Sequence, residues 1–315
     1  MKRFPFPFPH DAYRYSANIE PALTRAETAA GAWGDTVLEV DGDYRVELAE
    51  RRAILQSDPS RMALLDHMRP AAWDALVLLL ETLAQQYPRD MAFERSGRSC
   101  RWVNRLLDEE RDFVLGDDSS LPGGPLAYAS SQVQEDIVLL DQREDALWLD
   151  AGVVTFAADW SMGFDVGMRF LEVHGPVPRI HEEQIISRAQ HFIMRLQPGR
   201  NYRRTNWTMT VGRRLDTSTE TYPEWGPDRV SIVDDPELPE RLHLRVEVQH
   251  LIRLPRSGAV MFLVRTYLAS LAEVATIPAW RDRLGKVLAE LPQDMADYKG
   301  ISRYREAASD WLLGV

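Results

Sequence analysis

The sequence predicts an α+β fold in which helical segments at both ends of the chain enclose a central region of strands. Two observations support this prediction. Apolar residues recur at helical spacing near both ends of the chain, whereas they alternate with polar residues in the middle. In addition, helical and strand patterns do not alternate along the chain, as they do in parallel α/β proteins.

The clearest helix is expected from Pro70 to Tyr87, because one apolar stripe runs along it and Pro88 prevents its continuation. An earlier helix is expected from about Tyr44 to Leu55. Other segments with helical spacing are 126–140, 180–196 and 277–313.

The best hairpin is near the C-terminus, where residues 242–249 alternate between apolar and polar side chains. A turn at Pro255–Gly258 leads into a second strand over 259–268. Shorter strand-like patterns are expected in two runs within 146–156 and over 206–211. Residues 1–40 and 96–125 are rich in turn-forming or polar residues, so we expect irregular segments and short elements there.

The composition excludes several classes of protein. A net charge of −11 disfavours non-specific nucleic-acid binding. The single cysteine, Cys100, allows neither an internal disulfide nor a four-thiolate iron–sulfur cluster. No apolar stretch is long enough to span a membrane, and the alternating Phe and Pro at the start do not form a signal peptide. The reducing cytosol is therefore the expected location.

The familiar nucleotide and hydrolase motifs are also missing. The chain has neither of the glycine-rich phosphate-binding patterns GxGxxG and GxxxxGK[ST]. It also lacks the zincin motif HExxH and the nucleophile elbow GxSxG.

Among the seven histidines, His174 is the most informative. Gly175, Pro176 and Pro178 prevent a helix from continuing beyond it, so its ring is presented from a stiff extended segment. A stiff mount suits an axial metal ligand, because little freedom is lost on binding. It also suits a plain turn.

Several strands carry polar side chains that could line a pocket. Arg204, Asn206 and Trp207 lie at the start of one strand, where an arginine could donate to bound oxygen or to a propionate. Glu247 lies on the polar face of the hairpin and could hold an ammonium group. The alternatives are a salt-bridged strand end and a solvated sheet face. Arg265 and Tyr267 occur in an apolar strand, so at least one of them is expected to face a polar group inside the protein.

Taken together, several segments resemble the haem-dependent oxidative N-demethylase family, which includes the large subunit of dimethylamine monooxygenase. They occur in the family's order and cover roughly residues 30–290. The matching segments are Ser131–Ile137, Ala151–Phe156 with Trp160, Val173–Pro178, Arg204–Trp207, Leu244–Gln249, Arg253–Val260 and Arg265–Tyr267.

The resemblance implies one domain over residues 1–315, with an N-terminal arm (1–40), a PAS-like antiparallel core that binds haem b (approximately 120–275) and C-terminal helices (277–315). It implies oxidation of a small secondary amine such as dimethylamine with O2, giving a primary amine and formaldehyde. The electrons would come from NADPH through partner subunits that carry a flavin and an iron–sulfur cluster.

The resemblance also suggests residue roles. His174 would be the axial haem ligand, with His181 as the alternative, and Arg204 would stabilise iron-bound dioxygen. Asn206 and Trp207 would line or support that wall, and Glu247 would hold the substrate ammonium or relay protons. Additional pocket residues would be Arg265 and Tyr267.

Two positions depart from the family pattern. Val248 stands where relatives often have arginine, and Arg179 stands where they often have glycine, which leaves the identity of the amine open. A haem-binding sensor or carrier, and a haem-free protein that retains only the fold, remain alternative interpretations.

Overall fold

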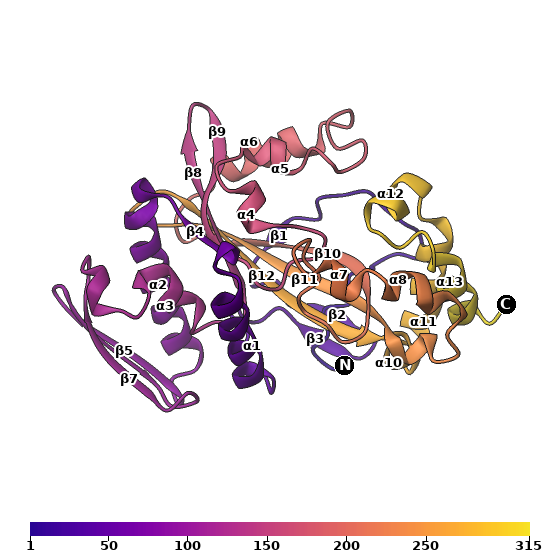
Figure 1. Cartoon of the computed structure of the whole chain (residues 1–315), viewed down its shortest axis with the longest axis horizontal. Helices are drawn as coiled ribbons and strands as arrows, with labels where there is room; N and C mark the ends of the chain where they lie inside the picture. Colours follow the sequence, from indigo (N-terminus) through magenta and orange to yellow (C-terminus); the bar gives the residue numbers. More distant parts are fainter.

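The computed structural model describes residues 1–315 and has the expected α+β architecture (Figure 1). Its centre is a seven-stranded sheet with the order β1-β10-β11-β12-β8-β9-β4, and every neighbouring pair is antiparallel. The strands are β1 (Glu20–Pro21), β4 (Met62–Leu64), β8 (Asp136–Arg143), β9 (Ala146–Val153), β10 (Tyr202–Val211), β11 (Leu242–Arg253) and β12 (Val260–Ser270).

The segment between β9 and β10 covers one face of this sheet, which we call the α6 face. It contains the short helices α4 (Met162–Asp165) and α5 (Phe170–Val173), followed by α6 (Ile185–Met194). Ile193 and Leu196 pack in one cluster with Leu251 of β11. Because side chains alternate across a strand, Tyr202, Arg204 and Asn206 of β10 also lie on the α6 face.

Two separate groups of elements cover the reverse face. The helices α1 (Tyr44–Ser57), α2 (Arg69–Gln86) and α3 (Gly124–Ser130) share a core with β8, β9 and the adjoining ends of β11 and β12. The other half of the reverse face packs against the C-terminal helices and the phenylalanines of the N-terminal arm. The C-terminal helices are α10 (Leu271–Ala275), α11 (Pro278–Glu290), α12 (Gln293–Tyr298) and α13 (Arg305–Leu313).

The remaining elements are short. The arm contains the hairpin β2 (Ala26–Thr28) and β3 (Gly31–Trp33). Between β10 and β11 lie α7 (Tyr222–Trp225), α8 (Asp228–Ser231) and α9 (Leu238–Arg241). No helix combines the length and apolar character that crossing a membrane would require.

The predictions for α1, α2 and the hairpin β11–β12 are confirmed. The helix predicted over 126–140 is wrong beyond Ser130, because β8 begins at Asp136. The run Ile137–Leu140 is buried on both faces of the sheet, so it is continuously apolar and shows no strand periodicity.

Other boundaries also differ from the prediction. Within residues 96–125, β6 (Ser99–Asn104) and β7 (Glu109–Val114) join β5 (Met91–Ser96) in a separate three-stranded sheet. This sheet was missed because many of its side chains are exposed and polar. The two runs expected within 146–156 form the single strand β9, and α6 begins at Ile185, not near residue 180.

Candidate functional site

Two neighbouring strands place six polar side chains together on the α6 face. The register pairs Arg204 with Gln249, Asn206 with Glu247, and Thr208 with Arg245. Residues paired across an antiparallel ladder point to the same side, so the six groups form two facing rows. Arg204, Asn206 and Glu247 are among the residues predicted from the sequence, and the sheet register brings them together.

Hydrogen bonds join this polar wall around the Glu247 carboxylate. Oε2 accepts from Asn206 Nδ2 at 3.3 Å and from Gln249 Nε2 at 3.0 Å, and Oε1 accepts from Arg245 Nε at 3.3 Å. Arg245 is fully buried and also donates to the carbonyl of Leu215 at 2.7 Å. Glu247 is therefore held in place with its charge partly balanced.

Arg204 continues the same network towards the edge of the sheet. Its Nη1 donates to Gln249 Oε1 at 3.2 Å, and its Nε donates to the carbonyl of Ala17 at 3.1 Å. Burial lowers the pKa of Arg204, and the charge of Glu247 opposes that shift. An arginine nevertheless keeps its proton inside proteins, so Arg204 supplies a fixed positive charge to this wall.

His174 lies directly after α5, and its ring has a defined orientation. Nδ1 lies 2.8 Å from the carbonyl oxygen of Phe170, which can only accept, so Nδ1 carries the proton. Burial lowers the pKa of His174 to about 4, and the positive charge of Arg204 contributes to that shift. The imidazole is therefore neutral near pH 7, with the lone pair of Nε2 available to a metal.

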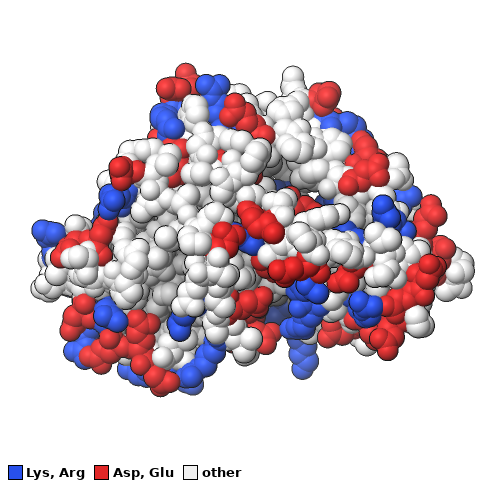
Figure 2. Space-filling model, viewed as in Figure 1, with Lys and Arg blue, Asp and Glu red and all other residues white.

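Partly buried apolar side chains lie near His174 and the sheet. Phe170 packs against the His174 ring, with 4.3 Å between the ring centroids. Val173, Trp160 and Phe262 are likewise only partly buried against the core of the α6 face. Figure 2 shows a hollow between the part of the molecule that holds α5 and α6 and the C-terminal helices.

The N-terminal arm and the C-terminal region close the far side of this site. Tyr15 donates from its hydroxyl to the carbonyl of Pro178 at 2.8 Å. Arg179, one of the departures from the family pattern, lies over the Tyr15 ring at 5.5 Å and pairs with Asp294 at 2.8 Å. His181, the alternative ligand, is exposed.

Three of the predicted site residues have side chains on the reverse face. Trp207 packs there against Phe8, with 5.0 Å between ring centroids. Arg265 pairs with Glu47 at 2.8 Å and Asp41 at 2.7 Å, and it lies over the Tyr267 ring at 5.0 Å. The sheet therefore separates Trp207, Arg265 and Tyr267 from His174.

Arg265 and Tyr267 instead border a small polar cavity of about 20 Å³, as does Val248, the second departure from the family pattern. Both ring nitrogens of His250 are buried there without a hydrogen-bond partner, as is Glu135 Oε2. This volume is enough for one water molecule, which these groups could bind. No sequence pattern predicts this cavity, because its walls come from segments far apart in the chain.

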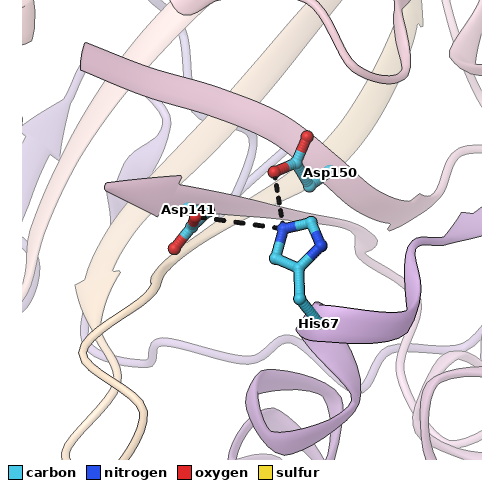
Figure 3. Close-up of side chains that lie close together, drawn as sticks. All are labelled: His67, Asp141 and Asp150. Carbon is cyan, nitrogen blue, oxygen red and sulfur yellow. Dashed lines mark hydrogen bonds and ion pairs between the residues drawn. The ribbon is translucent and has the colours of Figure 1, made fainter. Parts of the chain in front are cut away.

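A second polar cluster lies at the other end of the sheet (Figure 3). His67 Nε2 is 2.9 Å from Asp150 Oδ2 and 3.9 Å from Asp141 Oδ2, which is a possible ligand set for a metal. However, Arg143 forms ion pairs with both carboxylates, including one at 2.7 Å to Asp141. A cation already balances these charges, so we interpret the cluster as an ion-pair network.

The α6 face thus defines a class of site in which a neutral, oriented imidazole and an arginine occur together beside partly buried apolar surface. These features fit a flat apolar macrocycle that needs one nitrogen ligand. The model of the family "haem-dependent oxidative N-demethylase, alpha subunit-like" matches residues 29–309. The chain therefore belongs to this family, and the sequence-based identification is confirmed.

Because this family is described as haem-dependent, haem is the expected cofactor, and the chain is placed among the oxidoreductases. The description as alpha subunit-like also suggests an enzyme made of several subunits.

Proposed function

We propose that this chain is the haem b-binding subunit of a cytoplasmic monooxygenase that removes a methyl group from a small secondary amine such as dimethylamine. The observation that carries the proposal is the oriented, neutral His174 beside the polar wall of Arg204 and Glu247, in a chain of this family.

A PAS-like core is consistent with the strand connectivity. The strands β9-β8-β12-β11-β10 are consecutive in the sheet, and the helical segment with His174 joins β9 to β10. In this arrangement the haem would lie between the helical crossover and one face of the sheet. The proposed core spans approximately residues 120–275 within the single domain 1–315.

His174 would hold the haem through Nε2. The Nδ1 hydrogen bond to Phe170 fixes the tautomer and the ring plane, so the ligand is oriented before haem arrives. Phe170 and Val173 would provide apolar contacts for the haem. When bound, haem would supply the activation of O2 and accept electrons from a partner that carries a flavin and an iron–sulfur cluster and is reduced by NADPH.

Arg204 and Glu247 would perform different tasks on the polar wall. Arg204 would supply a positive charge to stabilise the negative charge that develops on oxygen during the reaction, and preorganised charges of this kind lower reaction barriers. Glu247 would bind the substrate ammonium group and accept its proton at a carboxylate oxygen. Asn206 and Gln249 orient that carboxylate, which leaves less freedom to lose when the amine binds.

The product is determined by where the oxygen atom is inserted. Hydroxylation of one N-methyl carbon gives a carbinolamine, which breaks its C–N bond to release formaldehyde and the primary amine. A chain that binds haem but turns over no amine would instead act as a sensor or carrier, which is the alternative function.

The proposal is tested by reconstituting the purified chain with haem and titrating dimethylammonium against the Soret band. A saturable shift is expected, and Glu247→Gln should weaken it roughly 10- to 100-fold, because a charge-assisted hydrogen bond is lost. Glu290→Gln, an exposed acid on α11, is the matched control. Haem binding with no response to any small secondary amine would favour the sensor or carrier.

A further inference from the structure

A second, separate cleft lies where α6 ends and β10 begins. Its volume is about 340 Å³, and neither His174 nor Arg204 belongs to its lining. The side chains that line it are Arg188, His191, Phe192, Arg195, Leu196, Gln197, Arg200 and Tyr202. Three arginines and a histidine thus converge on one concavity that contains no acidic group.

The three arginines have no acidic partner. None of the guanidinium groups of Arg188, Arg195 and Arg200 has a carboxylate oxygen within 4.0 Å. The acid nearest to Arg188 in sequence, Glu183, pairs with Arg179 instead, at 3.9 Å, and offers Arg188 only its backbone carbonyl, at 3.2 Å. The cleft therefore gathers three arginines whose charges no carboxylate balances directly.

Helical geometry brings the basic groups to one side of the cleft. Arg188 and His191 are exposed three positions apart on α6, and Arg195 is the exposed C-cap residue directly after this helix. A bound anion would accept several charge-assisted hydrogen bonds from the arginines.

The backbone on either side of the cleft is held firmly. Arg253 is buried beneath the end of α6 and donates to the carbonyls of Ile193, Met194 and Leu196 at 3.1, 2.8 and 3.2 Å. Gly199 has a φ of 79°, which favours glycine, in the turn that returns Arg200 to the cleft. The positions of the arginines thus follow from a fixed helix end and a fixed turn.

Aromatic side chains form part of the cleft wall. Phe192 and Tyr202 are partly buried and pack edge to face, with 4.9 Å between their ring centroids and 84° between their planes. Their exposed ring surface could contact a planar group of a ligand. Arginines that donate two hydrogen bonds at once match the geometry of phosphate oxygens.

We propose that this cleft binds a small molecule that carries two or more phosphate groups. Its size supports a small ligand: pockets for such molecules have volumes of roughly 300–1,000 Å³, whereas a protein partner covers about 800 Å² of surface. The inference does not depend on the proposed oxidation of amines.

Isothermal titration of the haem-loaded chain with pyrophosphate and with ADP tests the proposal. Both should bind, and the variant Arg188→Ala/Arg195→Ala/Arg200→Ala should lose roughly tenfold or more in affinity for each arginine that contacts phosphate. If ADP binds more tightly than pyrophosphate and Phe192→Ala removes that difference, the aromatic wall also recognises the adenine ring. Equal binding of both probes would show recognition of the phosphates alone.

The matched control is Arg25→Ala/Arg213→Ala/Arg281→Ala, which removes the same charge from exposed sites. It should bind both probes like the parent chain, and circular dichroism should show both variants folded. Failure of both probes to bind, or equal affinity in the two triple variants, would refute the proposal. Binding of a glutamate-rich peptide in place of both probes would also refute it, and would indicate a protein partner.

Discussion

The protonation state of His174 makes a quantitative prediction for haem binding. Its pKa is about 4, compared with an ordinary value of 6.5. Protonation of the ring in the folded protein is therefore harder by about 3 kcal/mol, since each pKa unit corresponds to about 1.4 kcal/mol. Only a neutral imidazole can coordinate iron, so protons compete with haem only when the pH approaches 4.

Haem affinity should consequently stay constant from pH 8 to about pH 5, and then fall roughly tenfold for each further pH unit below about 4. The assay is a Soret titration of the haem-free chain at a series of pH values. Far-ultraviolet circular dichroism at each pH shows that the fold persists. A midpoint near the ordinary histidine value of 6.5, with the fold intact, would show that the ligand is not the buried His174 described here.

Two further predictions concern the reverse face of the sheet. Arg265→Met should destabilise the chain by roughly 3–5 kcal/mol in urea unfolding, because Glu47 and Asp41 lose their buried partner, yet it should leave the Soret maximum unchanged. A shifted Soret maximum would contradict its placement away from the haem. Burial raises the pKa of Glu135 to about 7, from 4.5. The folded protein therefore favours the neutral carboxyl of Glu135. This contribution to folding stability is fully present below about pH 4.5, and it is lost as the pH rises to about 7. Glu135→Gln should remove this loss and be more stable than the parent by about 3 kcal/mol at pH 8. Equal stability of the two proteins at pH 8 would show that Glu135 ionises normally.

The sequence predicted the α+β class and the hairpin well, because β11 and β12 are neighbours both in the chain and in the sheet. It could not predict that β8 pairs with β12, since their registered residues are more than a hundred positions apart in the chain. The strand β8 was also hidden by its burial on both faces, which removes the alternation that identifies a half-buried strand.

Strand patterns also predict part of the candidate site. Strand patterns predict polar roles for Arg204, Asn206 and Glu247, and the register of β10 and β11 puts them on the face of His174. Arg265 and Tyr267 were selected from an equally polar pattern, but their positions in the alternation direct them to the reverse face. A sequence pattern gives the two faces of a strand without saying which one the cofactor will occupy.

The assignment of His174 as the haem ligand on the α6 face is tested by the absorbance spectrum of His174→Ala beside that of His181→Ala after haem reconstitution. We expect a loss of stoichiometric binding or a changed Soret band in His174→Ala, partial restoration by added imidazole, and an unchanged spectrum in His181→Ala. An unchanged spectrum in His174→Ala, or loss of haem in His181→Ala alone, would contradict the account.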